Sequence, residues 1–115
     1  MSANLLQAAK DAANALDQKF GKNIVVLDIS DVSTIADYFI ITEANNPNQV
    51  QAMVNGVEEV MDKHSISLHH IEGLQRADWV LMDFGDILVH IFDEESRNFY
   101  DLERTWRDAR QLNSL

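Results

Sequence analysis

Two apolar runs separated by a short acidic corner constrain this 115-residue chain more than any other stretch. The runs Trp79–Asp83 and Asp86–Phe92 flank Phe84-Gly85, and an amphipathic segment containing Phe99 and Trp106 follows them. Alternating runs joined by a glycine-containing pair are typical of a β-hairpin. Apolar residues at helical spacing predict that the following helix packs its stripe back onto the sheet. The chain is therefore expected to fold around a hairpin that leads into a helix.

The turn of this hairpin decides which side chains meet across it. If Phe84-Gly85 is a two-residue loop, three pairs share one face: Trp79 with His90, Leu81 with Leu88, and Asp83 with Asp86. The other face is purely apolar and is expected in the core: Val80, Met82, Ile87, Val89 and Ile91. Like charges directly opposite each other are unfavourable. The acidic pair is therefore either solvated at the turn or satisfied by a cation or a basic partner.

The whole chain predicts a single-domain α/β sandwich. Five strands and three helices follow in the order α-β-β-α-β-β-β-α, which predicts a mixed sheet with helices packed on it. Helices are expected over residues 2–20, from 47, and over 94–110, and strands over 23–29, 38–42, 67–73, 79–83 and 86–92. The second strand is nearly all apolar, which is typical of a strand buried on both faces. We expect one domain over residues 1–112 and a frayed tail at 113–115.

The second helix has a well-marked start. Asn46 suits the N-cap, Pro47 the first helical position and Gln49 the third, as in a capping box. Its apolar stripe carries Met53 and Met61, and such a stripe is far more often core than binding groove. The helix is therefore expected to pack against the sheet.

The charge balance restricts the partners of the chain. Nine basic and nineteen acidic residues give a net charge of −10, which repels phosphate backbones, so we expect no direct nucleic-acid binding. Such a surface serves solubility, or it attracts and orients a basic protein. The chain has no cysteine, which excludes disulfides and thiolate metal sites. It shows neither an apolar run of membrane-spanning length nor a leader pattern, so we expect a cytoplasmic protein without membrane contact.

No motif in the sequence predicts catalysis. Asp83 and Asp86 on neighbouring strands would suit Mg²⁺ in nucleotidyl transfer, but no phosphate-binding glycine loop is present. The triplet Asp83-Phe84-Gly85 matches a kinase motif by chance, because a kinase does not fit in 115 residues. His69 and His70 are strand neighbours that point to opposite faces and cannot bind one ion together. We therefore expect that the protein is not an enzyme and binds neither a cofactor nor a metal. A magnesium-dependent nucleotidyltransferase is the weaker alternative.

The helix after the hairpin carries further candidates. Its apolar stripe, expected on the sheet, comprises Phe99, Leu102 and Trp106. Tyr100 and Glu103 lie beside this stripe, and Arg97 and Asp101 are four residues apart, which predicts a helical ion pair. His90 is expected to be a half-buried packing residue opposite a tryptophan. An exposed aromatic ring rimmed by acids makes a protein-binding hot spot, whereas a buried one closes the core.

The combined pattern resembles the Iojap and ribosomal silencing factor (RsfS) family. From the hairpin onward the match comprises Trp79, Asp83, Phe84, Gly85, Asp86, His90, Glu95, Arg97, Tyr100, Leu102, Glu103 and Trp106. Upstream it includes Ser33, Asp37, Phe39, Ile41 and Glu72-Gly73, so the resemblance extends over residues 5–108. The chain departs from the family at residues 43–47, which read Glu-Ala-Asn-Asn-Pro where relatives have a small Gly/Thr/Ser-rich turn.

The resemblance implies a non-enzymatic ribosome-binding factor with a nucleotidyltransferase-like fold that lacks the active site. Such proteins dock on the large ribosomal subunit through its basic protein L-fourteen, block joining of the small subunit and repress translation in nutrient limitation. Homodimers occur in the family. We expect the partner-binding residues to be Trp79, Asp83, Asp86, Glu95 and Tyr100, with Arg97 holding the acidic residues in place. The alternative is an acidic homodimeric protein-binding module with a different partner.

Overall fold

A strand buried on both faces lies inside a mixed sheet. In the computed structural model, which describes residues 4–112, β2 (Tyr38–Glu43) pairs parallel with β5 (Ile87–Phe92) and antiparallel with β1 (Lys22–Asp28). The sheet has six strands in the order β3-β4-β5-β2-β1-β6. The mixed α/β sandwich is therefore confirmed, although the expected number of strands, five, was one too few.

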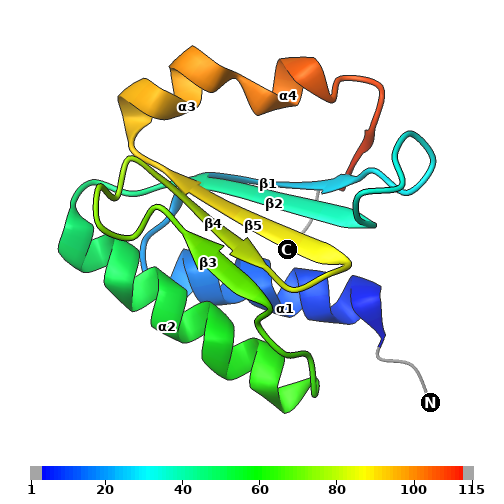
Figure 1. The fold of residues 1–115 in the computed structure, drawn as a ribbon, viewed down its shortest axis with the longest axis horizontal. Coiled ribbons are helices and arrows are strands. Elements are labelled where there is room, and N and C mark those ends of the chain that lie inside the picture. The colour runs from blue at the N-terminus through cyan, green and yellow to red at the C-terminus, as the bar shows by residue number, and fades with distance from the viewer. Residues whose placement is uncertain (1–3, 113–115) are drawn as a thin grey trace.

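Helices cover both faces of this sheet (Figure 1). α1 (Leu5–Gln18) and α2 (Pro47–Lys63) lie on one face, and α3 (Glu94–Tyr100) and α4 (Leu102–Thr105) lie on the other. The remaining strands are β3 (His70–Glu72), β4 (Trp79–Asp83) and β6 (Arg110–Leu112). Within residues 4–112, no helix is long and apolar enough to cross a membrane.

α1 is held close to the core by small side chains. Its buried residues are Ala8, Ala9, Ala12, Ala13, Ala15 and Leu16. The observed helix is shorter than the expected 2–20, and Ser2 lies outside the described residues. Phe20 was expected to be the last residue of this helix and to lie on its apolar face, but it lies beyond the helix, has a φ of 67° and is 81% exposed. The Gly21 N–H donates to the Leu16 carbonyl at 2.9 Å, and the helix ends at Gln18, two residues earlier than expected.

The predicted start of α2 is confirmed. The Asn46 side chain accepts the N–H of Gln49 at 2.8 Å, and the Gln49 side chain accepts the N–H of Asn45 at 2.6 Å. Pro47 occupies the first turn. Each free N–H at a helix start needs such an acceptor, so this reciprocal pair fixes where the helix begins.

The apolar face predicted for the hairpin is also confirmed. Val80, Met82, Ile87, Val89 and Ile91 are each 0% exposed and pack in one cluster with residues of α1 and α2. The opposite face carries a second cluster, which contains Phe39, Ile41, Leu88 and Phe92. Leu102 and Trp106 of the α3–α4 side pack against this second cluster, as the stripe predicted.

The predicted register of the hairpin is wrong by two residues. Trp79 pairs with Phe92, Leu81 with His90 and Asp83 with Leu88. The two-residue loop is Gly85-Asp86, since the Phe84 N–H donates to the Ile87 carbonyl at 3.0 Å across it. Gly85 has a φ of 88°, which the first position of such a turn requires and glycine adopts freely. Asp83 and Asp86 are therefore not opposite each other.

The last predicted helix is broken, which also corrects the expected ion pair and stripe. Asp101 takes the left-handed conformation (φ 47°), so α3 ends at Tyr100, α4 ends at Thr105, and β6 forms where the helix was expected to finish. The break turns Phe99 outward, where it is 79% exposed rather than packed on the sheet. A short aspartate tolerates this backbone conformation better than most residues do. The predicted Arg97–Asp101 pair is replaced by contacts with Glu43 and Glu103.

Several strand limits also differ from the prediction, most clearly in the third and first strands. The third strand, expected over 67–73, is reduced to His70–Glu72, and the first begins at Lys22 and ends at Asp28 rather than spanning 23–29. The tail expected at 113–115 lies outside the described residues.

Candidate protein-docking face

One part of the α3–α4 face of the sheet is left open at the β3–β4 edge. We call this part the docking face; it comprises His70, Glu72, Trp79, Leu81 and Asp83. His70 pairs with Asp83 and Glu72 with Leu81, so these side chains stand on the same side as Trp79. His70 and Glu72 are exposed and the three β4 residues are half-buried. A hollow of about 230 Å³ opens here between Glu72, Gly73, Trp79 and Leu81.

Gly73 allows the backbone after β3 to pass close to Trp79. It has a φ of 87°, and a Cβ at this position would lie 2.0 Å from the Trp79 carbonyl oxygen. Only glycine permits so close an approach of two backbones. The connector that follows β3 therefore passes directly beside Trp79.

Aromatic rings join the docking face to α3. The Trp79 ring lies 4.5 Å from the Tyr100 ring and 5.1 Å from the Phe92 ring, centroid to centroid. Tyr100 is 45% exposed and Phe99, beside it, is 79% exposed. Rings that pack against other rings on one side and are open on the other offer large rigid contact areas, which are typical of protein-binding hot spots. The structure thus brings together the predicted pair Trp79 and Tyr100.

The two hairpin aspartates lie at the other end of β4 and differ in their surroundings. The Asp83 carboxylate accepts the Gly85 N–H at 2.7 Å and so stabilises the turn. Asp86 is exposed in the turn, and its backbone carbonyl accepts the N–H groups of Asp37 and Tyr38 at 2.8 and 3.0 Å. Four residues of strand, roughly 13 Å, separate Trp79 from Asp83. The face therefore has an aromatic end and an acidic end.

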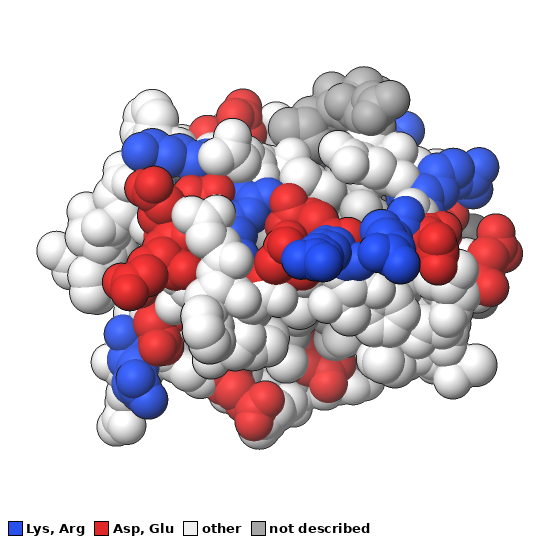
Figure 2. Space-filling view, turned by 90° about the horizontal axis from the view of Figure 1, so that it is seen from above, with Lys and Arg blue, Asp and Glu red and all other residues white. Residues whose placement is uncertain are grey.

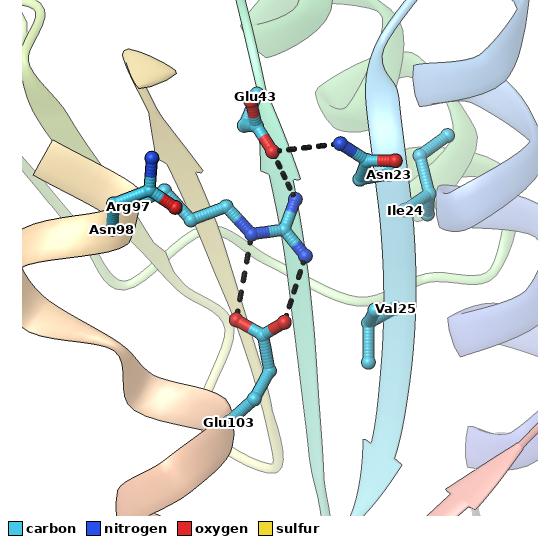
Figure 3. A pocket seen from close by; sticks show the side chains of 7 residues that line it. All are labelled: Asn23, Ile24, Val25, Glu43, Arg97, Asn98 and Glu103. Atoms are coloured by element: carbon cyan, nitrogen blue, oxygen red, sulfur yellow. Dashed lines mark hydrogen bonds and ion pairs between the residues drawn. The ribbon is translucent and has the colours of Figure 1, made fainter. Parts of the chain in front are cut away.

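Arg97 is buried and binds within the chain. Its guanidinium donates to the Glu43 carboxylate at 3.1 Å, and to both Glu103 carboxylate oxygens at 3.1 and 3.4 Å (Figure 3). A further bond reaches the Lys22 carbonyl at 3.3 Å, and Asn23 donates to Glu43 at 3.0 Å. A hollow of about 490 Å³ opens beside these side chains. Because a bidentate arginine–carboxylate pair fixes geometry, Arg97 holds α3 and α4 against β1 and β2.

Charge on the α3–α4 side is divided between its two ends. Figure 2 shows acidic side chains gathered over the end where α3 begins, and several basic ones over α4 and the chain after it. Asp93, Glu94 and Glu95 belong to the first end, and Arg104 and Arg107 to the second. Glu95 is exposed and lies two residues, about 200° around the helix, from Arg97. It therefore points away from the sheet and stands apart from Trp79 and Asp83.

Sequence reasoning missed the roles of two residues on the α3–α4 side of the sheet. Glu43 was expected in the loop after a strand ending at residue 42, but it is the last residue of β2 and binds Arg97, 54 positions away, a contact that no local pattern predicts. His90 was expected to be half-buried but is only 4% exposed. Burial lowers the pKa of His90 from 6.5 to about 4, since charging it in apolar surroundings is unfavourable. Its ring is therefore neutral at physiological pH.

The fold and this face together define a small α/β domain that presents aromatic rings and carboxylates on one uncovered sheet edge. No cluster of three His, Cys, Asp or Glu side chains suited to a metal ion occurs in the described part of the chain. A model of the family described as "Ribosomal silencing factor during starvation" matches residues 2–115. The chain belongs to this family, RsfS.

Individual relatives agree with this assignment. The Ribosomal silencing factor RsfS of Bacillus subtilis is 41% identical over 100 residues, which cover 87% of this chain and 85% of the relative. A mouse protein named Mitochondrial assembly of ribosomal large subunit protein 1 is 32% identical over 95 residues, covering 79% of this chain and 41% of its own length. A crystal structure of a Chromobacterium violaceum protein superposes with a TM-score of 0.84 at 30% identity, covering 89% of this chain and 85% of that one.

Proposed function

We propose that this protein silences ribosomes in the cytoplasm by docking on the large ribosomal subunit and blocking its union with the small one. The observation that carries the proposal is the Trp79–Tyr100 ring pair, 4.5 Å apart, at the border of an uncovered sheet face in a member of the RsfS family. An apolar anchor beside carboxylates fits a protein whose surface is basic. The name of the mouse relative points to the large subunit as the site of action.

The partner we propose on the large subunit is its basic protein L-fourteen. A net charge of −10 favours a basic protein over bare RNA, because phosphate groups and this surface repel each other. Asp83 and Asp86 would receive lysine or arginine side chains at one end of β4, and Trp79 and Tyr100 would bury apolar area at the other end. Arg97 contributes by fixing α3, and thereby Tyr100, rather than by direct contact, because it is 6% exposed.

The proposed activity is steric and needs neither a cofactor nor a catalysed step. A domain with principal extents of 37 × 30 × 25 Å is large enough to occupy part of a subunit interface. We infer that bound protein keeps the small subunit away simply by occupying that space. Residues 1–112 would act as one unit in this role.

Co-sedimentation with isolated large and small ribosomal subunits tests the proposal. We expect the protein to pellet with large subunits only, and added protein to reduce the light-scattering increase that follows mixing of both subunits. Pelleting with neither subunit at moderate salt would contradict it. Sedimentation velocity of the protein alone shows whether a homodimer exists and whether large subunits dissociate it.

A further inference from the structure

His90 sits directly behind the aromatic end of the docking face. It lies on β5, and its ring is 4.8 Å from the Phe39 ring, 6.0 Å from the Trp79 ring and 6.2 Å from the Phe92 ring. With 4% of its surface exposed, it has no access to a partner. Any role of this imidazole in docking must therefore pass through a neighbour.

One hydrogen bond connects His90 to the surface. The indole N–H of Trp79 donates to His90 Nδ1 at 3.1 Å. Nδ1 can accept only when it carries no proton, so the neutral ring bears its proton on Nε2. Within residues 4–112, Nε2 finds no hydrogen-bond partner.

This arrangement is unfavourable for packing alone. A buried donor without an acceptor destabilises a core, and an apolar side chain of similar volume would avoid that cost. The imidazole does what leucine or phenylalanine cannot do, which is to accept the indole N–H. The tilted ring contacts of Trp79 with Phe92 and Tyr100 are not directional enough to fix the rotation of the indole, whereas a hydrogen bond to one edge of the ring fixes it.

We propose that His90 is a positioning residue of the docking face, which holds the Trp79 indole in its docking orientation by accepting its N–H. The effect on docking rests on the proposed function, whereas the effect of His90 on the orientation of Trp79 can be tested without it. It also specifies the contact: the indole N–H is used inside the protein, so Trp79 offers the partner an apolar ring edge and no donor. A preorganised anchor binds more tightly than one that must be ordered on contact.

Two substitutions separate the hydrogen bond from the volume of the ring. His90→Leu removes the acceptor, whereas His90→Asn keeps a carbonyl oxygen at the same number of bonds from the backbone as Nδ1. Indole ¹H–¹⁵N resonances report the bond, with Trp106 as the internal reference and Trp79→Phe for assignment. We expect His90→Leu to shift the Trp79 signal and speed its hydrogen exchange, and His90→Asn to restore both towards the original values.

Binding to large subunits provides the second readout. We expect His90→Leu to weaken retention about tenfold, as for the loss of one ordering hydrogen bond, and His90→Asn to stay within about threefold of the original protein. If the unsubstituted protein does not bind large subunits, the proposed function fails. The indole resonances still test whether His90 orients Trp79. Equal binding by a folded His90→Leu protein, or an unmoved Trp79 signal, would overturn the inference.

A third variant covers the case in which His90→Leu does not fold. His90→Gln places its carbonyl one bond further out, near the position of Nε2, where it cannot reach the indole N–H. We expect His90→Asn to bind more tightly than His90→Gln at similar thermal stability. The reverse order would overturn the assignment.

Discussion

The two faces of the sheet are built on different principles. The α1–α2 face is dry and continuous: Met53, Val57, Val80, Met82 and Val89 are all 0% exposed. The α3–α4 face buries an arginine between two carboxylates and a histidine among aromatic rings, and it leaves β3 and β4 partly open. One face needs only apolar volume, whereas the other depends on directed bonds between residues far apart in the sequence. The first face serves stability, and we assign docking to the second.

Removal of Arg97 should have the largest effect on stability and sharpen this contrast. Arg97→Met leaves Glu43, with 11% of its side chain exposed, as an uncompensated buried charge. We expect a loss of about 3–5 kcal/mol in the free energy of unfolding, measured by urea titration. Arg104→Met, at an exposed position of α4, is the matched control and should change little. A loss below about 1 kcal/mol would show that Arg97 does not hold α3 and α4.

A cavity on the opposite face should cost nearly as much but leave docking intact. Met82→Ala removes a side chain that is 0% exposed on the α1–α2 side, so we expect a loss of about 2–5 kcal/mol. Large-subunit binding of the folded protein should stay unchanged in pelleting assays well below the unfolding temperature. Weakened binding by fully folded Met82→Ala protein would contradict the assignment of stability to one face and docking to the other.

Acid should weaken the α3–α4 face through His90. Its pKa is lowered to about 4 in the fold against 6.5 for the free side chain, so the unfolded chain takes up a proton first as pH falls. The stabilisation is complete above pH about 6.5, declines below it and is lost near pH 4, a total of roughly 3 kcal/mol. Urea titrations across this range check the decline. His90→Asn should flatten it, and an identical slope in both proteins would contradict the assignment.

The smallest effect is expected at Phe99. Because this ring is 79% exposed on α3, Phe99→Ser should change the free energy of unfolding by no more than about 0.5 kcal/mol. Thermal unfolding measures this change. A loss as large as that of a core residue would mean that Phe99 packs on the sheet, as the helical stripe first indicated.

The sequence predicted what local patterns control. The alternation of β4 and β5 identified the core face, and Asn46, Pro47 and Gln49 located the start of α2. The register of the hairpin was missed by two residues because Gly85 suits either position of a two-residue turn, and in the structure it takes the first, so that Asp83 pairs with Leu88.

Features that depend on distant residues escaped the sequence. The break at Asp101 and strand β6 follow from the Arg97–Glu103 contact and from pairing with β1, neither of which leaves a periodic signal. For the candidate site, the structure joins Trp79 and Tyr100 but sets Asp86 and Glu95 apart from them. Residue types were therefore predictable, and their spatial grouping was not.

Charge substitution at the acidic end tests the central claim most directly. Asp83→Asn keeps the oxygen that accepts the Gly85 N–H, so together with Asp86→Lys it alters charge without removing that bond. The matched control is Glu58→Gln with Asp62→Lys, which makes the same change in net charge at two exposed positions on α2. With unchanged circular dichroism, we predict that the first pair abolishes co-sedimentation with large subunits and that the control pair retains it. Undiminished binding by the Asp83→Asn/Asp86→Lys protein would contradict docking through this face.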